Sequence, residues 1–168
     1  MREASCKLKY LKVLAFTLAL VAGPGWAALP EVQEGDDLHA DAQRATQEDL
    51  PILLAFAADY CEYCTQLEEW FLVPMLISGD YEDRILIRKV RIDSSRPLVD
   101  FDGAAIERDR LASRYGVQMV PTLVFVDAQG RELTERMVGL TTLDFYGGYL
   151  EQRIDAAVGQ VRGGEAAP

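Results

Sequence analysis

The stretch PILLAFAADYCEYC, residues 51–64, decides the fold of this chain. Residues 51–57 form a short, continuously apolar run, which is typical of a strand buried on both faces. The pair Cys61 and Cys64 follows at once. A helix is predicted from this pair onward because apolar residues recur there at helical spacing, namely at Leu67, Trp70 and Phe71. Pro74 is expected to end or kink that helix about three turns in.

The sequence on either side of this stretch predicts one α/β domain. Further helices are expected at residues 36–48, 104–115 and 141–158, and further strands at residues 85–92, 121–126 and 132–138. Turn residues at 127–130 should join the last two strands into a hairpin, and Gly116 is a plausible helix C-cap. The order helix, strand, helix, strand, helix, hairpin, helix predicts a central mixed β-sheet flanked by helices.

Composition excludes several classes of protein. The chain has 168 residues, of which 49% are hydrophobic and 26% charged. These values fit one globular domain and exclude a disordered, collagen-like or multi-span membrane protein. The formal net charge is −10, which argues against nucleic acid or an anionic membrane surface as the main partner.

The first 27 residues have the layout of a secretory signal peptide. A basic leader precedes an apolar run at residues 13–22, and residues 25–27 (GWA) place small residues at positions −3 and −1 of a cleavage site. That run is well short of the ~20 residues that span a bilayer. We therefore expect cleavage after Ala27 and a domain of residues 28–168, with an uncleaved anchor as the alternative.

The cysteines leave three interpretations of one pair. Cys6 lies in the expected signal peptide, which leaves Cys61 and Cys64 with C-x-x-C spacing. A structural zinc site needs four ligands, and the single histidine, His39, is far from the pair in sequence. A permanent structural disulfide would close a very small loop and remove little entropy from the unfolded chain. The third interpretation is a redox pair.

A redox pair gives this spacing a physical reason. Cys61 would lie at the N-terminal end of the helix, where unpaired N–H groups and the helix dipole stabilise a thiolate. Cys64, one turn later on the same face, could attack the mixed disulfide that Cys61 forms with a substrate. We expect Cys61 to be the attacking thiolate and Cys64 the resolving thiol. The dithiol would itself be the redox centre, so no cofactor and no metal are expected.

The chain resembles the thioredoxin family from about residue 51 to residue 158. The matching marks are the strand and cysteines of PILLAFAADYCEYC, the MVPT segment at 119–122 with the strand and turn after it, and VGL at 138–140 with the last helix. The resemblance implies a thioredoxin fold. It also implies that the Val120–Pro121 bond is cis, lies against the cysteines and presents the backbone of Val120 to an extended client peptide.

Several residues depart from the family pattern. Tyr60 stands in place of the usual tryptophan before the first cysteine, and we place it with Val120 and Pro121 among the substrate-binding residues. Glu62 and Tyr63 stand between the cysteines and should tune the redox couple.

A second departure concerns proton transfer. Cytoplasmic thioredoxins carry a buried aspartate six residues before the first cysteine, and this chain has Ala55 there. Deprotonation of Cys64 must then rely on another group or on water.

The charges around the first cysteine favour a reductant. Asp59 and Glu62 place negative charge near Cys61 and should oppose its ionisation. We predict a periplasmic thiol–disulfide oxidoreductase with protein disulfides as partners, which as a reductant would take electrons from a membrane donor. Neither nucleic-acid binding nor stable membrane association after cleavage is expected. A disulfide oxidase or isomerase, and a redox-inert peptide-binding module, remain as alternatives.

Three further features of the sequence carry expectations. Residues 94–103 are an insertion relative to the shortest thioredoxins, expected to pack against the domain, with a partner-facing lip as the alternative. The pair Glu68 and Glu69 is expected to be a solvated helix face. Five aromatic residues are expected in the core or on helix faces: Trp70, Phe71, Phe145, Tyr146 and Tyr149.

Overall fold

Four strands build the central sheet of the structure, a computed structural model that describes residues 30–163. They are β1 (Ile52–Ala57), β2 (Leu86–Arg91), β5 (Thr122–Val126) and β6 (Met137–Val138). Their order across the sheet is β2-β1-β5-β6. β1 and β2 are parallel, whereas β5 is antiparallel to both β1 and β6. The predicted mixed sheet is confirmed. The predicted signal peptide lies outside the described residues.

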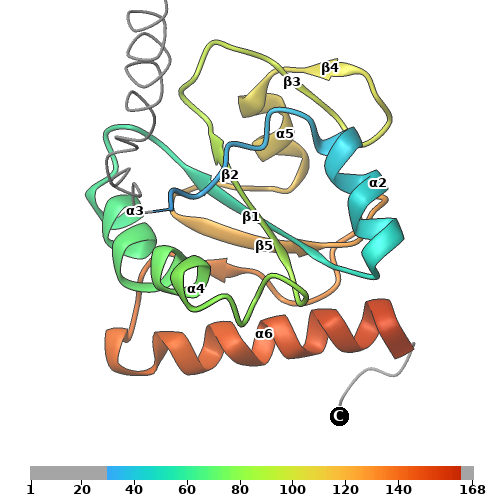
Figure 1. The fold of residues 1–168 in the computed structure, drawn as a ribbon. Helices are drawn as coiled ribbons and strands as arrows, with labels where there is room; N and C mark the ends of the chain where they lie inside the picture. Colours follow the sequence, from blue (N-terminus) through green and yellow to red (C-terminus); the bar gives the residue numbers. More distant parts are fainter. Residues whose placement is uncertain (1–29, 164–168) are drawn as a thin grey trace, which may run out of the picture.

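Helices cover both faces of this sheet (Figure 1). The helical segments are α2 (Leu38–Glu48), α3 (Glu62–Leu67), the π-helix η1 (Glu68–Leu72), α4 (Val73–Ser78), α5 (Arg108–Arg114) and α6 (Leu143–Gly163). Side chains of α3, η1, α4 and α6 pack on one face, against Leu53 and Phe125 among others. Side chains of α2 and α5 pack on the other face, against Leu54 and Phe56.

β1 is the centre of this architecture because all six of its residues are buried. Alternate residues of a strand point to opposite faces, so β1 contributes Leu53 and Ala55 to one core and Leu54 and Phe56 to the other. A strand that is apolar at every position can satisfy both layers at once. The interpretation of residues 51–57 as a strand buried on both faces is confirmed.

Pro74 does not end the helix that follows the cysteines. A proline lacks the N–H group of a helical residue, and its ring clashes with the carbonyl four residues earlier. The chain widens into η1, where the N–H of Val73 bonds to the carbonyl of Glu68, five residues back. Pro74 then falls in the first turn of α4, where a proline is tolerated. The prediction that Pro74 ends the helix is therefore wrong, because helical residues continue to Ser78.

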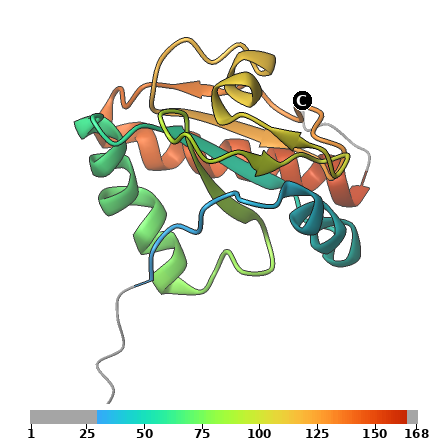
Figure 2. The same ribbon diagram turned by 90° about the horizontal axis from the view of Figure 1, so that it is seen from above.

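The insertion packs against the domain, as expected. It contributes β3 (Leu98–Val99), which pairs with β4 (Ala105–Ile106) in a separate two-stranded sheet. Leu98 is buried in the same core as α5, and Figure 2 shows this small sheet on the α5 side of the central sheet. Residues 105–106 form a strand because they pair with β3, so α5 begins at Arg108 rather than at the predicted residue 104.

One other local prediction needs correction, and the structure divides the five aromatic residues between the core and exposed helix faces. The predicted strand at 132–138 is reduced to β6, together with an isolated antiparallel bridge between Glu132 and Val126. Two of the five aromatic residues belong to the core, since Tyr146 is buried and Phe71 packs against it with ring centroids 4.9 Å apart. The remaining three are exposed, namely Trp70, Phe145 and Tyr149.

α6 is tied to the rest of the domain by charge as well as by packing. Glu151 accepts hydrogen bonds from the hydroxyl of Tyr81 at 2.8 Å and from Arg84 at 2.6 Å. Burial alone would raise the pKa of Glu151, but these two hydrogen bonds and the charge of Arg84 outweigh it and lower the pKa below its usual value.

Candidate active site

Cys61 is the N-cap residue of α3. Its backbone is extended, and its Sγ accepts a hydrogen bond from the N–H of Cys64 at 3.1 Å. The carbonyl of Cys61 accepts further bonds from the N–H groups of Cys64 and Thr65. The first sulfur therefore lies at the positive end of the helical run, where backbone N–H groups stabilise negative charge.

The two cysteines are joined in a disulfide and differ in exposure. Their Cα atoms are 5.3 Å apart. Cys61 is half-buried, whereas Cys64 is only 3% exposed. The first cysteine is therefore the more accessible of the two to an incoming protein. In this oxidised state neither sulfur is a thiolate, so neither is available as a zinc ligand.

The proline segment lies at the same end of the sheet as the cysteines. Phe56 near the end of β1 pairs with Thr122 at the start of β5, so the residues that follow β1 and those that precede β5 meet at one edge. The Val120–Pro121 peptide bond is cis. Val120 is half-buried and Pro121 is buried.

Exposed apolar side chains surround this end of the sheet. Tyr60 is 77% exposed and Tyr63 is 62% exposed, on the two sides of Cys61 in sequence. Met119, just before the proline segment, is also exposed. Large apolar side chains in water are unfavourable unless another surface covers them. Tyr60, Tyr63 and Met119 are called the apolar rim below.

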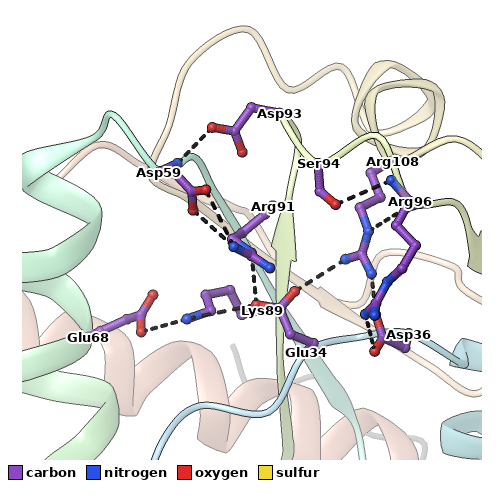
Figure 3. A network of polar contacts seen from close by, with 10 residues as sticks. All are labelled: Glu34, Asp36, Asp59, Glu68, Lys89, Arg91, Asp93, Ser94, Arg96 and Arg108. Atoms are coloured by element: carbon purple, nitrogen blue, oxygen red, sulfur yellow. Dashed lines mark hydrogen bonds and ion pairs between the residues drawn. The ribbon is translucent and has the colours of Figure 1, made fainter.

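The charge on Asp59 is partly compensated. The carboxylate of Asp59 lies 3.1 Å from the guanidinium of Arg91, and its backbone N–H donates to Asp93 at 2.8 Å (Figure 3). Glu62 is exposed in the first turn of α3. Of the two acidic residues expected to oppose ionisation of Cys61, Glu62 therefore has the less compensated charge.

A cavity of about 260 Å³ reaches the second cysteine from the side of β2. Cys64, Glu68, Lys89 and Arg91 are among the residues that line it. Lys89 donates to the carboxylate of Glu68 at 3.0 Å, as Figure 3 shows. Lys89 is also the residue of β2 that pairs in register with Ala55 of β1.

Glu68 is the site residue that the sequence interpretation missed. It was expected to be solvated together with Glu69, and that expectation holds for Glu69 alone, because the Glu68 side chain is only 24% exposed. A signal was present in the sequence: Glu68 follows Cys64 by four residues, and residues so spaced share one face of a helix.

Three further observations concern the rest of the described chain. A larger hollow of about 520 Å³ lies beside Asp49, Asp127 and Gln160, but no cysteine lines it. Within residues 30–163 there is no cluster of three or more His, Cys, Asp or Glu side chains suited to a metal ion. None of the helices in that range has the length and apolar character needed to cross a bilayer.

Comparison with known proteins decides the family. The family described as a thioredoxin-like domain matches residues 38–154. The chain belongs to the thioredoxin-like domain family. A thioredoxin-like fold that carries a C-x-x-C disulfide supports thiol–disulfide oxidoreductase chemistry in general.

Several solved thioredoxins are similar to this chain. The thioredoxin of Malassezia sympodialis is 20% identical, with a TM-score of 0.51 over 78% of this chain and 96% of its own. The oxidised mitochondrial thioredoxin 3 of Saccharomyces cerevisiae is 19% identical, with a TM-score of 0.49 over 74% of this chain and 93% of its own. A mutant thioredoxin of Halobacterium salinarum is 26% identical, with a TM-score of 0.44 over 74% of this chain and 96% of its own.

Proposed function

We propose that this thioredoxin-like protein is an exported, periplasmic thiol–disulfide oxidoreductase that reduces disulfides in client proteins. The observation that carries the proposal is the asymmetry of the cysteine pair. Cys61 is accessible at the helix N-cap with an N–H directed at its sulfur, and Cys64 is buried one turn later. One sulfur is thus suited to attack a client and the other to displace it.

The reaction needs two exchanges. In the reduced protein the thiolate of Cys61 attacks one sulfur of the client disulfide, forming a mixed disulfide and releasing the first client thiolate. Cys64, once deprotonated, attacks the sulfur of Cys61, which restores the disulfide between the cysteines and releases the second client thiolate. Two electrons pass from the dithiol to the client, so neither a cofactor nor a metal takes part.

The client is held at the end of the sheet where the proline segment and the cysteines meet. The backbone of Val120, next to the buried Pro121, supports an extended client chain by strand-like hydrogen bonding. The apolar rim, with Tyr60 as its most exposed member, covers the client's own apolar residues. Glu62 and Tyr63, between the cysteines, tune the couple.

The reducing direction is supported by the charges at the site. Residues 59–64 contain no positively charged side chain, and Glu62 adds an exposed negative charge beside Cys61. A thiolate in such a setting is stabilised less than one beside a cation, which makes the disulfide harder to reduce and the dithiol a better reductant. To turn over in an oxidising compartment the protein takes electrons from a membrane donor.

A titration of the reduction potential tests the direction. The protein is equilibrated with glutathione or dithiothreitol buffers, and the fraction of disulfide is read by alkylation and mass. We expect a couple near or below ~−270 mV, whereas a value near ~−120 mV would make it an oxidant. Failure of the pair to exchange at all would leave a redox-inert peptide-binding module.

Two variants test the assigned cysteines. Cys61→Ser should abolish insulin reduction, and Cys64→Ser should accumulate a client on Cys61 as a mixed disulfide visible by mass spectrometry. Insulin reduction that survives in Cys61→Ser would overturn the assignment. The export part of the proposal is tested separately, by the N-terminal residue of the protein recovered from a periplasmic extract, which should be Ala28.

A further inference from the structure

The buried cysteine needs a proton acceptor. Cys64 is 3% exposed, so bulk water has little access to its thiol in the mixed-disulfide state. The thiolate, not the thiol, is the nucleophile that releases the client. Ala55, which lies on β1 six residues before Cys61, has no group that could accept the proton. Another group must take it.

Three carboxylates line the cavity that reaches Cys64, and they differ in exposure and in their ion-pair partners. Asp59 is paired with Arg91, and its side chain is 70% exposed. Glu69 is exposed. Glu68 is the least exposed of the three at 24%, and it lies one helical turn from Cys64, whose carbonyl accepts the N–H of Glu68. Side chains four residues apart on a helix lie on the same face.

Lys89 holds the carboxylate of Glu68 at the cavity. Its Nζ lies 3.0 Å from Glu68 and 3.9 Å from Glu34. The guanidinium of Arg91 lies 3.1 Å from Glu34 and so competes with Lys89 for that carboxylate. Glu68 is paired with Lys89 from β2, and Lys89 also lies near Glu34 from the segment before α2 (Figure 3). The other charged groups that line the cavity are Arg91 from β2, Asp59 from the segment after β1, and Glu69 from the same helix as Glu68.

We infer that Glu68 is the proton acceptor for Cys64 and that Lys89 positions it. This inference rests on the proposed redox function. In the second exchange the Cys64 thiol gives its proton to the carboxylate of Glu68, directly or through water in the cavity. At about 260 Å³ the cavity has room for several water molecules of ~30 Å³ each.

The bonds and electrons of this step balance without a further reactant. The Cys64 thiolate forms a bond to the sulfur of Cys61 as the bond from Cys61 to the client sulfur breaks. The client leaves as a thiolate with the electron pair of the broken bond. The proton on Glu68 then passes to that thiolate or to solvent, which returns the carboxylate to its starting form.

The two exchanges can be timed separately. The reduced protein is mixed with excess oxidised glutathione, quenched with acid and alkylating agent at intervals, and the mixed disulfide and internal disulfide are counted by mass. Glu68→Gln keeps the shape of the side chain and removes its basicity. We expect it to leave formation of the mixed disulfide within about twofold of wild type and to slow its resolution about a hundredfold at pH 7. Glu69→Gln, the matched control, should change neither rate.

The pH profile of the second step separates proton transfer from a structural effect. In the wild type the resolution rate should change little around neutral pH, whereas in Glu68→Gln, where hydroxide must remove the Cys64 proton, the rate should rise steeply with pH. Glu68→Asp should restore part of the rate. Should Glu68→Gln fail to fold, Lys89→Met gives the same readout, and a reduced resolution rate with normal mixed-disulfide formation is expected.

The outcomes distinguish this inference from the proposed function. A wild-type protein that never forms the mixed disulfide refutes the redox function itself. The role of Glu68 alone is refuted if the wild type forms and resolves the mixed disulfide and Glu68→Gln resolves it at the wild-type rate from pH 5 to pH 9. Equal slowing by Glu69→Gln would also refute it, since the effect would then be one of net charge.

Discussion

Reduction of the disulfide between Cys61 and Cys64 should destabilise the folded protein by about 2 kcal/mol. The disulfide joins residues three apart in sequence. In the chain-entropy description a crosslink between ends so close restricts the unfolded chain by about 2 kcal/mol at 25 °C. The sign of this stability difference between the oxidised and reduced forms indicates whether the protein is a reductant or an oxidant. A dithiol that is a good reductant has an oxidised form that is the more stable of the two, whereas an oxidant is more stable when reduced.

The structure indicates why the oxidised form should be the more stable one. A stabilised Cys61 thiolate would favour the reduced folded state and work against the oxidised form. The Sγ of Cys61 accepts a hydrogen bond from the N–H of Cys64 at the helix N-cap. The exposed carboxylate of Glu62 in the first turn opposes a negative charge there. To reverse the sign, stabilisation of the thiolate would have to exceed the roughly 2 kcal/mol that the crosslink supplies.

Urea unfolding of the two forms measures the difference. With a slope of about 2 kcal/mol per molar urea, the midpoint of the oxidised protein should lie about 1 M above that of the protein in excess dithiothreitol. The double variant Cys61→Ser/Cys64→Ser is the control, and its midpoint should not respond to dithiothreitol. A reduced protein as stable as the oxidised one, or more stable, would refute the reducing direction.

Three other predictions concern the scaffold. Gly130→Ala should lower the free energy of unfolding by about 2 kcal/mol in urea titrations, because Gly130 has φ +74° and a Cβ there would lie 2.7 Å from a ring carbon of Phe101. Its control is Gly148→Ala, in open space on α6, which should raise the free energy of unfolding by about 1 kcal/mol. Tyr146→Phe should raise the urea midpoint, since the buried hydroxyl has no hydrogen-bond partner within residues 30–163, and a lower midpoint would contradict this. Burial raises the pKa of Tyr146 to about 12, so Tyr146→Phe should also remove a loss of stability that begins above the usual tyrosine value near 10. Glu151, whose pKa is lowered on folding, contributes stability above its unfolded value near 4.5 that is lost at lower pH, and thermal melts of Glu151→Gln should therefore show a weaker loss of stability on acidification than the wild type.

The central part of the fold could be predicted from local patterns. Residues 51–57 are apolar at every position, and such a short run is typical of a strand with a layer on each face. Gly116 has φ +60° directly after α5, as a residue that ends a helix requires. The cysteine pair at the start of a helix followed from its spacing and from the strand before it.

Predictions failed where a contact distant in sequence decided the outcome. Residues 105–106 have an ordinary helical pattern, but their pairing with β3 makes them a strand. Pro74 was expected to end or kink the helix, and the helix does not end there because the wider turn of η1 accommodates the proline. Exposure of Trp70 could not be predicted either, because helical spacing alone does not say which residues of a stripe lie beyond the edge of the neighbouring layer.

Composition alone determined the net acidity of the protein. The order of residues along the chain determined the strand at 52–57 and the cysteine pair at the first turn of the next helix, because both depend on neighbours a few positions away. The tertiary structure decided which carboxylate on the cysteine-bearing helix is paired and half-buried. Glu68 looks like a surface residue in the sequence, and it acquires a partner only when parallel pairing of β1 and β2 brings Lys89 beside it. A proton acceptor is defined by what surrounds it in space, and those surroundings exist only in the folded chain.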